Sequence, residues 1–323
     1  MIFKSKHCPL CKNKSTIFIF NKFDDRYGFK RYFKIVKCNN CLHKFVLNDL
    51  TPKDLKNLYS NFYPRSSFTI ADYKPLKPLN NKFLTWLNGD NGAHLHVPKN
   101  VRVLDIGCGF GESVGYHLNR NCEVYGVEAD SNIKKVIQHY GFNIKNGLFN
   151  FKDYERNFFD YVTMDQVLEH MLNPVKTLND ISKILKPSGV VIINIPNSES
   201  WGTKFFRTKW IHWHTPYHLQ HFSKNSISLA AKIAGYDLCQ IKTFTCSNWI
   251  YYQWMSLIAY PNYGKKSIFW ENNIRNMSKF SLKFWCFAFI KIIHQTKINH
   301  LITRVFDFFG LGDNLQVILK KKN

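Results

Sequence analysis

Four cysteines near the start of the chain form two pairs with the spacing of metal ligands. The pairs are CPLC and CNNC, and they contain Cys8, Cys11, Cys38 and Cys41. Two-residue spacing lets both thiolates of a pair reach one ion, and two such pairs complete a tetrahedral Zn²⁺ site. The segment between them, STIFIFNKFDDRYGFKRYFKIVKC, is aromatic and rich in strand-forming residues. We therefore predict a structural zinc ribbon over residues 1–47, which folds and docks rather than reacts.

Two other interpretations of this region are weaker. His7 and His43 flank the cysteine pairs, but four thiolates already complete the site, so we expect neither histidine to be a ligand. A redox-active CxxC pair would normally open a helix in a βαβ unit, and neither pair here does so.

Histidines are concentrated in WIHWHTPYHLQHFS, residues 210–223, which holds four of them among four aromatic rings. An imidazole with a pKa near neutrality can remove the proton from an acceptor hydroxyl. His218 and His221 follow Pro216 and are three residues apart, so they share a face if a helical turn forms. A structural role, in which the imidazoles bond to the backbone, stays open beside the catalytic one.

The other two histidines of this segment are expected to be bystanders. His212 and His214 alternate with Trp213, a pattern typical of surface or ring-stacking residues. A zinc site made from all four histidines is the least favoured interpretation, because no carboxylate spacing or helix organises it.

A third candidate is the glycine-rich stretch VRVLDIGCGFGESVGYHL. Residues 101–105 predict a short apolar strand, GCGFG a tight turn and residues 112–118 a helix. Glycines let the backbone approach a ligand closely, and the start of the helix offers free N–H groups. A dinucleotide site is the natural competitor, but it needs GxGxxG and a pyrophosphate, which Asp105 at the strand end would repel.

A second predicted strand, CEVYGVEADS, ends at Glu128, whose carboxylate is suited to a ribose diol. Asp105 would meet an amino group, the glycines allow close approach, and Glu128 would bind a ribose. Together these features describe S-adenosylmethionine better than a dinucleotide.

These motifs resemble those of the class I S-adenosylmethionine-dependent methyltransferases. VLDIGCGFG, VYGVEAD, FDYVTMDQVLEHMLNP and LKPSGVVIINIPN follow one another in that family's order and spacing over roughly residues 100–200. The resemblance implies an α/β fold with a Rossmann-like seven-stranded sheet, here with an N-terminal zinc ribbon and a helical C-terminal insertion. It also implies that the methionine end of the cofactor is lined by Asp105, Gly107, Gly109 and Gly111.

The same resemblance implies positions for the rest of the cofactor. Glu128 and the following Ala129 would bind the ribose side, and Met164 and Gln166 would lie beneath the sulfonium. Many relatives place an acid after the third strand to meet the adenine. IKNGLFNFKDYE offers none directly after Gly147, which leaves the Leu148 backbone or Asp153 for that role.

The wider pattern is similar to methyltransferases of bacterial surface-polysaccharide and modified-sugar pathways. It combines the two CxxC pairs, NFYP (61–64), PYHLQHFS and a final GLGDNLQVILKK. This resemblance implies that His218 or His221 meets the acceptor.

The segment DQVLEH also resembles the ubiquinone-type O-methyltransferases. His170, next to Glu169 and beside the expected methyl group, is therefore a further candidate for the base or acceptor contact. In those relatives a glutamate three positions before the EH helps hold a divalent cation. Gln166 stands there in this chain and is a poorer ligand, which counts against metal dependence.

These motifs must be positioned by elements that the rest of the sequence supplies. Residues 48–98 predict a helical connector, in which Thr51 is a plausible N-cap before Pro52. Residues 99–323 predict the methyltransferase domain. Within it we expect an acceptor loop at 196–223, a helical insertion at about 250–308 and a last strand at 313–320.

The insertion contains Ser278 to Gly310, which reads as one or two helices that are apolar on more than one face and carry lysine and arginine. Packing over the active site is the default expectation. A dimer contact and an interfacial helix on anionic lipid are the alternatives.

Composition sets limits on these expectations. The chain has 323 residues, 45% of them hydrophobic, so we expect a full globular core. Five of the nine cysteines are isolated, and the start of the chain has no apolar run, which favours the cytoplasm without a signal peptide. The sequence contains no run of 18 uncharged apolar residues, so we predict no membrane-spanning helix. The net charge of +23 is diffuse and accompanies many Lys, Asn, Ile and Phe residues, so AT-biased codon usage explains it slightly better than nucleic-acid binding.

The sequence therefore favours a cytoplasmic S-adenosylmethionine-dependent methyltransferase that acts on a sugar or glycan intermediate of cell-surface polysaccharide biosynthesis. We expect O-methylation of a small-molecule or lipid-linked sugar, with possible contact to the inner face of the membrane through the C-terminal helices. The first alternative is an RNA base methyltransferase that uses the zinc ribbon for docking. The second is a cofactor-binding scaffold without turnover.

Overall fold

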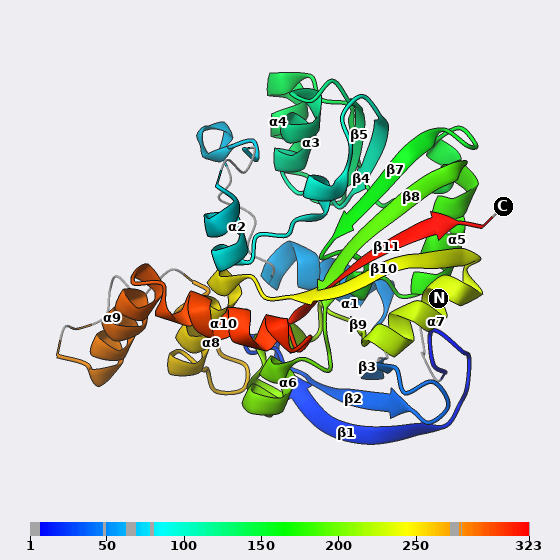
Figure 1. The fold of residues 1–323 in the computed structure, drawn as a ribbon. Coiled ribbons are helices and arrows are strands. Elements are labelled where there is room, and N and C mark those ends of the chain that lie inside the picture. Colours follow the sequence, from blue (N-terminus) through cyan, green and yellow to red (C-terminus); the bar gives the residue numbers. More distant parts are fainter. Residues whose placement is uncertain are drawn as a thin grey trace.

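The computed structural model describes residues 7–47, 50–62, 69–77, 81–271, 278 and 280–322. Its centre is a seven-stranded sheet in the order β10-β11-β8-β7-β4-β5-β6 (Figure 1). The strands are β4 (Arg102–Ile106), β5 (Glu123–Glu128), β6 (Ile144–Asn146), β7 (Phe159–Asp165), β8 (Leu185–Pro196), β10 (Tyr236–Phe244) and β11 (Asn314–Lys321). β6, β5, β4, β7 and β8 are parallel to one another, and β11 runs antiparallel to both of its neighbours. The predicted seven-stranded Rossmann-like sheet is confirmed.

Helices cover both faces of this sheet, as the alternation along β4 requires. Val103 packs with α3 (Glu112–Leu118) and α4 (Ile133–Tyr140). Leu104 points to the opposite face, where α5 (Pro174–Ile184) and α7 (Lys224–Ile233) pack. Strand residues buried on both faces are typical of a parallel sheet. Because helices cover both faces, the carboxyl ends of the central strands form the open edge of the sheet, where ligands can approach.

The N-terminal region forms a second, antiparallel sheet of four strands. Three belong to the predicted ribbon, namely β1 (Thr16–Phe23), β2 (Tyr32–Cys38) and β3 (Lys44–Leu47). The fourth is β9 (Gln220–His221), which comes from the middle of the domain and pairs with β3. The ribbon is therefore joined to the domain through the backbone of the histidine-rich segment.

The segment between the two sheets is made of short helices. They are α1 (Pro52–Asn57), η1 (Leu58–Phe62), η2 (Ile70–Asp72), α2 (Lys82–Asn88) and η3 (Ala93–His96). Thr51 caps α1 as predicted, because its hydroxyl accepts from the Asp54 N–H while the Asp54 carboxylate accepts from the Thr51 N–H. Part of the NFYP motif, Tyr63 and Pro64, lies outside the described residues.

Within the described residues, three helices are inserted between β10 and β11, where the sequence predicts a helical insertion. They are α8 (Ser247–Ile258), α9 (Leu282–Gln295) and α10 (Ile298–Phe308). They extend to one side of the sheet, beside α2 (Figure 1). None of the helices in the described ranges is both long and apolar enough to cross a membrane.

Short helices after β6, β7 and β8 complete the open edge of the sheet. They are η4 (Phe151–Asp153), η5 (Leu168–His170), α6 (Trp201–Phe206), η6 (Arg207–Lys209) and η7 (Ile211–Trp213).

Candidate active site

An acidic cavity of about 310 Å³ lies at the carboxyl ends of β4 and β7. Its lining residues are Leu76, Ala93, His94, Asp105, Gly107, Cys108, Gly109, Glu112, Ser113, Thr163 and Asp165. Three of them are carboxylic acids. The one basic side chain, His94, has its pKa lowered to about 4 by burial, which keeps it neutral near pH 7. Such a lining suits a cationic ligand and disfavours a pyrophosphate.

The glycine turn brings its backbone to this cavity. Gly107, Gly109 and Gly111 all have positive φ, at 72°, 60° and 83°. A Cβ on Gly107 would lie 2.5 Å from Cγ2 of Val167, so no other residue fits that position. The positive φ therefore favours glycine at all three positions, and the lack of space does so as well at Gly107.

Asp105 is the penultimate residue of β4, and its side chain lines the same cavity. Its Oδ1 accepts a hydrogen bond of 2.7 Å from Oγ1 of Thr163, and its Oδ2 accepts one from the hydroxyl of Ser113. Burial raises the pKa of Asp105 to about 6, while the two hydroxyl donors oppose that shift. A cation bound beside this carboxylate would offset the desolvation that raises the pKa.

Glu128 ends β5 and is held against the glycine turn. Its Oε2 accepts from the Gly109 N–H at 3.0 Å, and its Oε1 accepts from the Asp130 N–H at 2.8 Å. The next residue, Ala129, is exposed. Glu128 thus stands at the turn, as the sequence predicts for a ribose contact, though the 310 Å³ cavity does not reach it.

The two candidates for the adenine end lie at the same edge. The Gly147 N–H donates to the Glu128 carbonyl at 2.8 Å, which places Leu148 beyond the end of β5, and the Leu148 side chain is 80% exposed. Asp153 forms an ion pair of 2.6 Å with Lys145. The choice between these two for adenine stays a prediction.

The structure places Met164 and Gln166 outside the lining of the acidic cavity. Thr163 and Asp165 face the cavity, so Met164 between them points through the sheet into the core and is fully buried. Gln166 has φ +58°, and its Nε2 donates to Oδ1 of Asn314 at 3.2 Å, which turns it toward β11. Neither residue lines the acidic cavity.

Asp165 is a cavity acid that the sequence analysis missed. Its Oδ2 accepts from the Ala93 N–H at 2.8 Å and from Nδ2 of Asn194 at 3.2 Å. Period-two alternation along VTMDQ, starting from the C-terminal acid, would have indicated Thr163 and Asp165 rather than Met164.

A second polar group lies at η5. Oε1 of Glu169 is 3.8 Å from Nε2 of His218, and the rings of His170 and His218 are edge-to-face at 4.7 Å. Nδ1 of His170 bonds to the Tyr217 carbonyl at 2.9 Å, and Nδ1 of His218 bonds to the His212 carbonyl at 2.8 Å. These backbone bonds orient both imidazoles toward the carboxylate.

The chemistry of this group depends on its burial. Glu169 is fully buried, and its carboxylate oxygens make no hydrogen bond to any residue in the described ranges. Burial raises the pKa of Glu169 to about 8. The ligand atoms of Glu169, His170 and His218 lie within 4.8 Å of one another, so the three could exchange a proton or hold a divalent cation.

The other histidines of residues 210–223 have different environments. His221 is in strand β9 rather than a helical turn, so it does not share a face with His218, and its ring meets Trp213 at 4.7 Å. Burial lowers the pKa of His221 to about 3. His212 and His214 are buried, not at the surface, and His212 packs edge-on against Trp210. The whole segment is buried between the ribbon and the domain, and of its histidines only His218 joins a ligand group within the described ranges.

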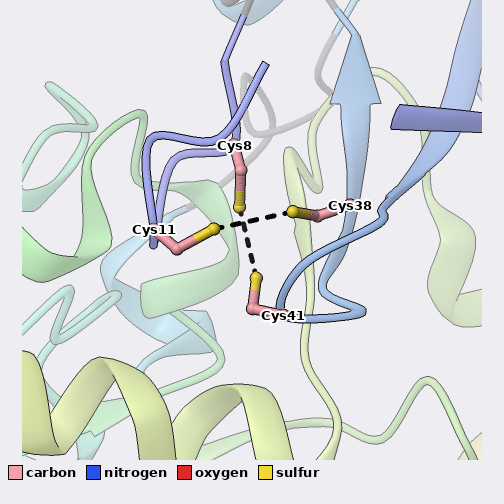
Figure 2. A group of neighbouring side chains, drawn as sticks. All are labelled: Cys8, Cys11, Cys38 and Cys41. Atoms are coloured by element: carbon pink, nitrogen blue, oxygen red, sulfur yellow. Dashed lines mark hydrogen bonds between the residues drawn. The ribbon is translucent and has the colours of Figure 1, made fainter. Parts of the chain in front are cut away.

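The four predicted metal-binding cysteines converge on one point (Figure 2). The Sγ atoms of Cys8 and Cys41 are 3.5 Å apart, as are those of Cys11 and Cys38, and all four lie within 4.8 Å of one another. Tetrahedral zinc with Zn–S bonds of about 2.3 Å requires sulfurs about 3.8 Å apart. The cluster fits that geometry. His43 is not part of it, because its Nε2 bonds to Oε1 of Gln220 at 3.0 Å.

A larger cavity of about 620 Å³ lies between the ribbon and the domain. Its lining includes four cationic side chains and one acid, namely Lys44, Lys204, Arg207, Lys224 and Glu199, beside the aromatic rings of Phe20 and Trp213. Lys44 is held in place by a hydrogen bond of 2.9 Å from its Nζ to the Ser198 carbonyl. The sequence analysis missed this basic cavity because its cations come from β3, α6, η6 and α7.

Comparison with known proteins identifies the family that the domain matches. Residues 93–241 match a family model described as a methyltransferase domain. Ubiquinone biosynthesis O-methyltransferases from Azoarcus sp. and from Burkholderia pseudomallei are each 28% identical, over 134 and 138 residues. Each match covers 39% of this chain, and the chain spans about half the length of these relatives, 55% and 56%.

The similarity to solved structures is more distant. A methyltransferase from Archaeoglobus fulgidus is 17% identical with a TM-score of 0.43, and the match covers 74% of this chain and 90% of that one. Phosphoethanolamine N-methyltransferase 2 from Haemonchus contortus is 18% identical with a TM-score of 0.44, covering 74% and 56%.

Proposed function

We propose that residues 93–241, which match a family model described as a methyltransferase domain, form a class I S-adenosylmethionine-dependent methyltransferase, and that the chain methylates an oxygen of a phosphate-bearing sugar or glycan intermediate. The observation that carries the cofactor assignment is the acidic cavity at the glycine turn. S-adenosylmethionine has a sulfonium and an ammonium group and, when bound, supplies an electrophilic methyl group. A cavity with three carboxylic acids and a neutral histidine attracts these cations.

Residues of the chain have distinct parts in this proposal. Asp105 would bind the ammonium group, since its carboxylate is buried and already oriented by two hydroxyls. The glycine turn allows the cofactor to lie against the backbone. The Glu128 carboxylate would accept hydrogen bonds from the ribose hydroxyls. Each of these contacts binds and orients the methyl donor, and alignment is a large part of catalysis in transfer reactions.

The basic cavity supports an anionic acceptor. Activated sugars carry phosphate esters, and four cationic side chains around an aromatic floor suit a phosphate joined to a ring system. The carboxyl end of β8 lies near both cavities. Asn194 bonds to Asp165 of the acidic cavity, and Asn197 lines the basic one three residues later, roughly 10 Å along an extended chain. A small acceptor held by its phosphate could reach the methyl donor over that distance.

An oxygen acceptor must lose a proton, and the group at η5 is the proposed place for it. His170 and His218 are oriented by backbone carbonyls, and Glu169 lies beside them with a pKa raised to about 8. His170 or His218 would accept the proton, and Glu169 would stabilise the imidazolium. None of the three lines either of the two cavities as described, so an acceptor must approach between them.

A structural zinc ion in the ribbon is part of the same proposal. The convergence of four sulfurs from two turns supports it, and thiolates are preferred ligands for Zn²⁺. By holding β3 against β9, the ribbon would keep the histidine-rich segment in place for the reaction.

The O-methyl assignment draws on the names of the relatives. Two of them are named for O-methyl transfer in ubiquinone biosynthesis, and they share the region of the domain with this chain. The basic cavity argues for a charged acceptor in place of a quinone precursor.

The test has a binding step and a turnover step. Calorimetry with S-adenosylmethionine should show one site per chain, with an affinity at least tenfold lower in Asp105→Asn. Methyl transfer is then measured with nucleoside-diphosphate sugars, with sugar phosphates and with RNA, each with and without added Mg²⁺. Product on a phosphate-bearing sugar supports the proposal. Product only on RNA would replace it with base or ribose methylation, and cofactor binding without product on any acceptor would favour a scaffold.

A further inference from the structure

Helix α10 has its polar side inward and its apolar side outward. The residues that it buries are Asn299, His300, Thr303 and Arg304. Those that it exposes are Ile298, Leu301, Ile302, Val305 and Phe308, with exposed fractions between 50% and 85%. A helix of a globular protein normally has the opposite arrangement.

The inward polar side is bonded to the neighbouring helices. Nδ2 of Asn299 donates to the Ser247 carbonyl at 3.2 Å, and Oγ1 of Thr303 bonds to Oγ of Ser247 at 3.1 Å. Arg304 donates to the Trp86 carbonyl at 2.6 Å and pairs with Asp307 at 2.9 Å. These bonds attach α10 to α8 and α2, so its orientation cannot be reversed without breaking them.

The outward apolar side continues onto the neighbouring helices. α9, which packs against α10, exposes a stripe with helical spacing made of Leu282, Trp285, Phe289 and Ile292. α2, which also packs against α10, exposes Phe83 and Trp86. We call this set of side chains on α2, α9 and α10 the apolar face. A soluble monomer rarely exposes so many large apolar side chains on neighbouring helices without a partner.

We propose that the apolar face binds the surface of an anionic lipid bilayer. Charge supports this partner. Between Ser278 and Gly310 the only acidic residue is Asp307, and it is paired with Arg304, whereas Lys283 and Lys291 are exposed. Aromatic and aliphatic side chains with nearby lysines are the composition of helices that lie in the membrane interface.

A second copy of this chain is a poorer partner for the same face. The two copies would bring identical lysines together with no free acid on these helices to offset them, on a chain of net charge +23. The proposal does not depend on methyl transfer, and it holds or fails whatever the acceptor is.

The experiment is flotation of the full zinc-loaded chain with vesicles of phosphatidylcholine alone and of phosphatidylcholine mixed with phosphatidylglycerol. The test variant is Leu301→Ser/Val305→Ser/Phe308→Ser, which removes exposed side chains only. The matched control is Ile17→Ser/Phe18→Ser/Ile233→Ser, which removes three exposed apolar side chains on β1 and α7. Circular dichroism of all three proteins checks that the fold is retained.

We expect the wild type and the control to float with the anionic vesicles, and the test variant to bind at least tenfold more weakly. Equal binding to both vesicle types, or no binding by the wild type, would overturn the proposal. So would undiminished binding by the test variant. A lipid-free dimer that the test variant dissociates, measured by light scattering, would assign the face to a second copy instead.

Discussion

Oε1 of Glu169 lies 3.8 Å from Nε2 of His218, with both side chains buried and Nδ1 of His218 bonded to a backbone carbonyl. This geometry leaves Nε2 of His218 directed at a carboxyl group whose pKa burial raises to about 8. When this carboxyl is ionised, a neutral imidazole beside it, at a distance one water or one ion could bridge, can receive a proton and is then stabilised by the carboxylate.

We predict that His218→Asn or His170→Asn lowers turnover on the true acceptor by about 10²–10⁴, the usual effect of losing a general base. His212→Asn and His214→Asn should leave it within a few-fold. The measurement is single-turnover methyl transfer at saturating cofactor, with cofactor affinity as the control. Near-normal rates in both of the first variants would mean that these histidines are structural.

His221 was a third candidate base in the sequence, and its position in β9 predicts a different defect. His221→Gln should reduce the stability of ribbon docking, because His221 packs on Trp213 and its strand pairs with β3. We expect a lower melting temperature with kcat per folded molecule nearly unchanged. A rate loss of 10² or more without a loss of stability would restore His221 as a catalytic residue.

Asp105→Ala and Glu128→Ala should each weaken S-adenosylmethionine binding at least tenfold, which is about 1.4 kcal/mol. The matched control is Asp160→Asn at the opposite end of β7, where the carboxylate pairs with Lys186 at 2.6 Å. Calorimetry on the three variants checks the assignment. Wild-type affinity in both site variants would refute it.

Cofactor affinity should fall as the pH drops through about 6. Burial raises the pKa of Asp105 to about 6, and only the ionised carboxylate attracts an ammonium group. Below that pH, binding must first remove the proton, which costs about 1.4 kcal/mol per pH unit. Affinity measured from pH 8 to pH 5 should be flat above 7 and fall below 6. The same profile in Asp105→Asn would show that another group titrates.

One zinc ion per chain is expected by elemental analysis. Cys8→Ser should release it and impair folding, since a four-thiolate site contributes folding free energy. Cys239→Ser, which changes an exposed and isolated cysteine, should keep the ion. A metal-free wild-type protein that is fully folded would contradict the ribbon assignment.

Substitutions in the basic cavity should weaken binding of the acceptor and leave binding of the cofactor unchanged. Lys204→Ala/Lys224→Ala removes two cations from its lining, and we expect KM for a phosphate-bearing acceptor to rise about tenfold with little change in kcat. Lys232→Ala on the exposed side of α7 is the control. An unchanged KM for every phosphate-bearing substrate tested would place the acceptor elsewhere.

The cofactor edge was largely predictable because it rests on local chemistry. Strand, glycine turn and helix follow one another within VRVLDIGCGFGESVGYHL, so Asp105 and the three glycines had to meet at one strand end. The cysteine cluster was equally predictable. CxxC spacing alone brings two thiolates to a common point, and two such turns supply the four ligands of a zinc site. The predicted order of motifs likewise gave the seven-stranded sheet.

The amino-acid sequence therefore predicts the sites whose geometry is encoded within one turn or one strand–turn–helix unit. The other features of the site join side chains from distant segments, so they became visible only in the tertiary structure. It took Met164 out of the cavity lining and put Asp165 into it, since strand alternation depends on which face meets the ligand. It placed His221 in a sheet with the ribbon and gathered three lysines and one arginine from four elements into one cavity. The outward orientation of the apolar side of α10 also depends on contacts with distant segments. The sequence of α10 is amphipathic, but that pattern does not say which side faces the protein. The hydrogen bonds that its polar residues make to α8 and α2 determine that the polar side does.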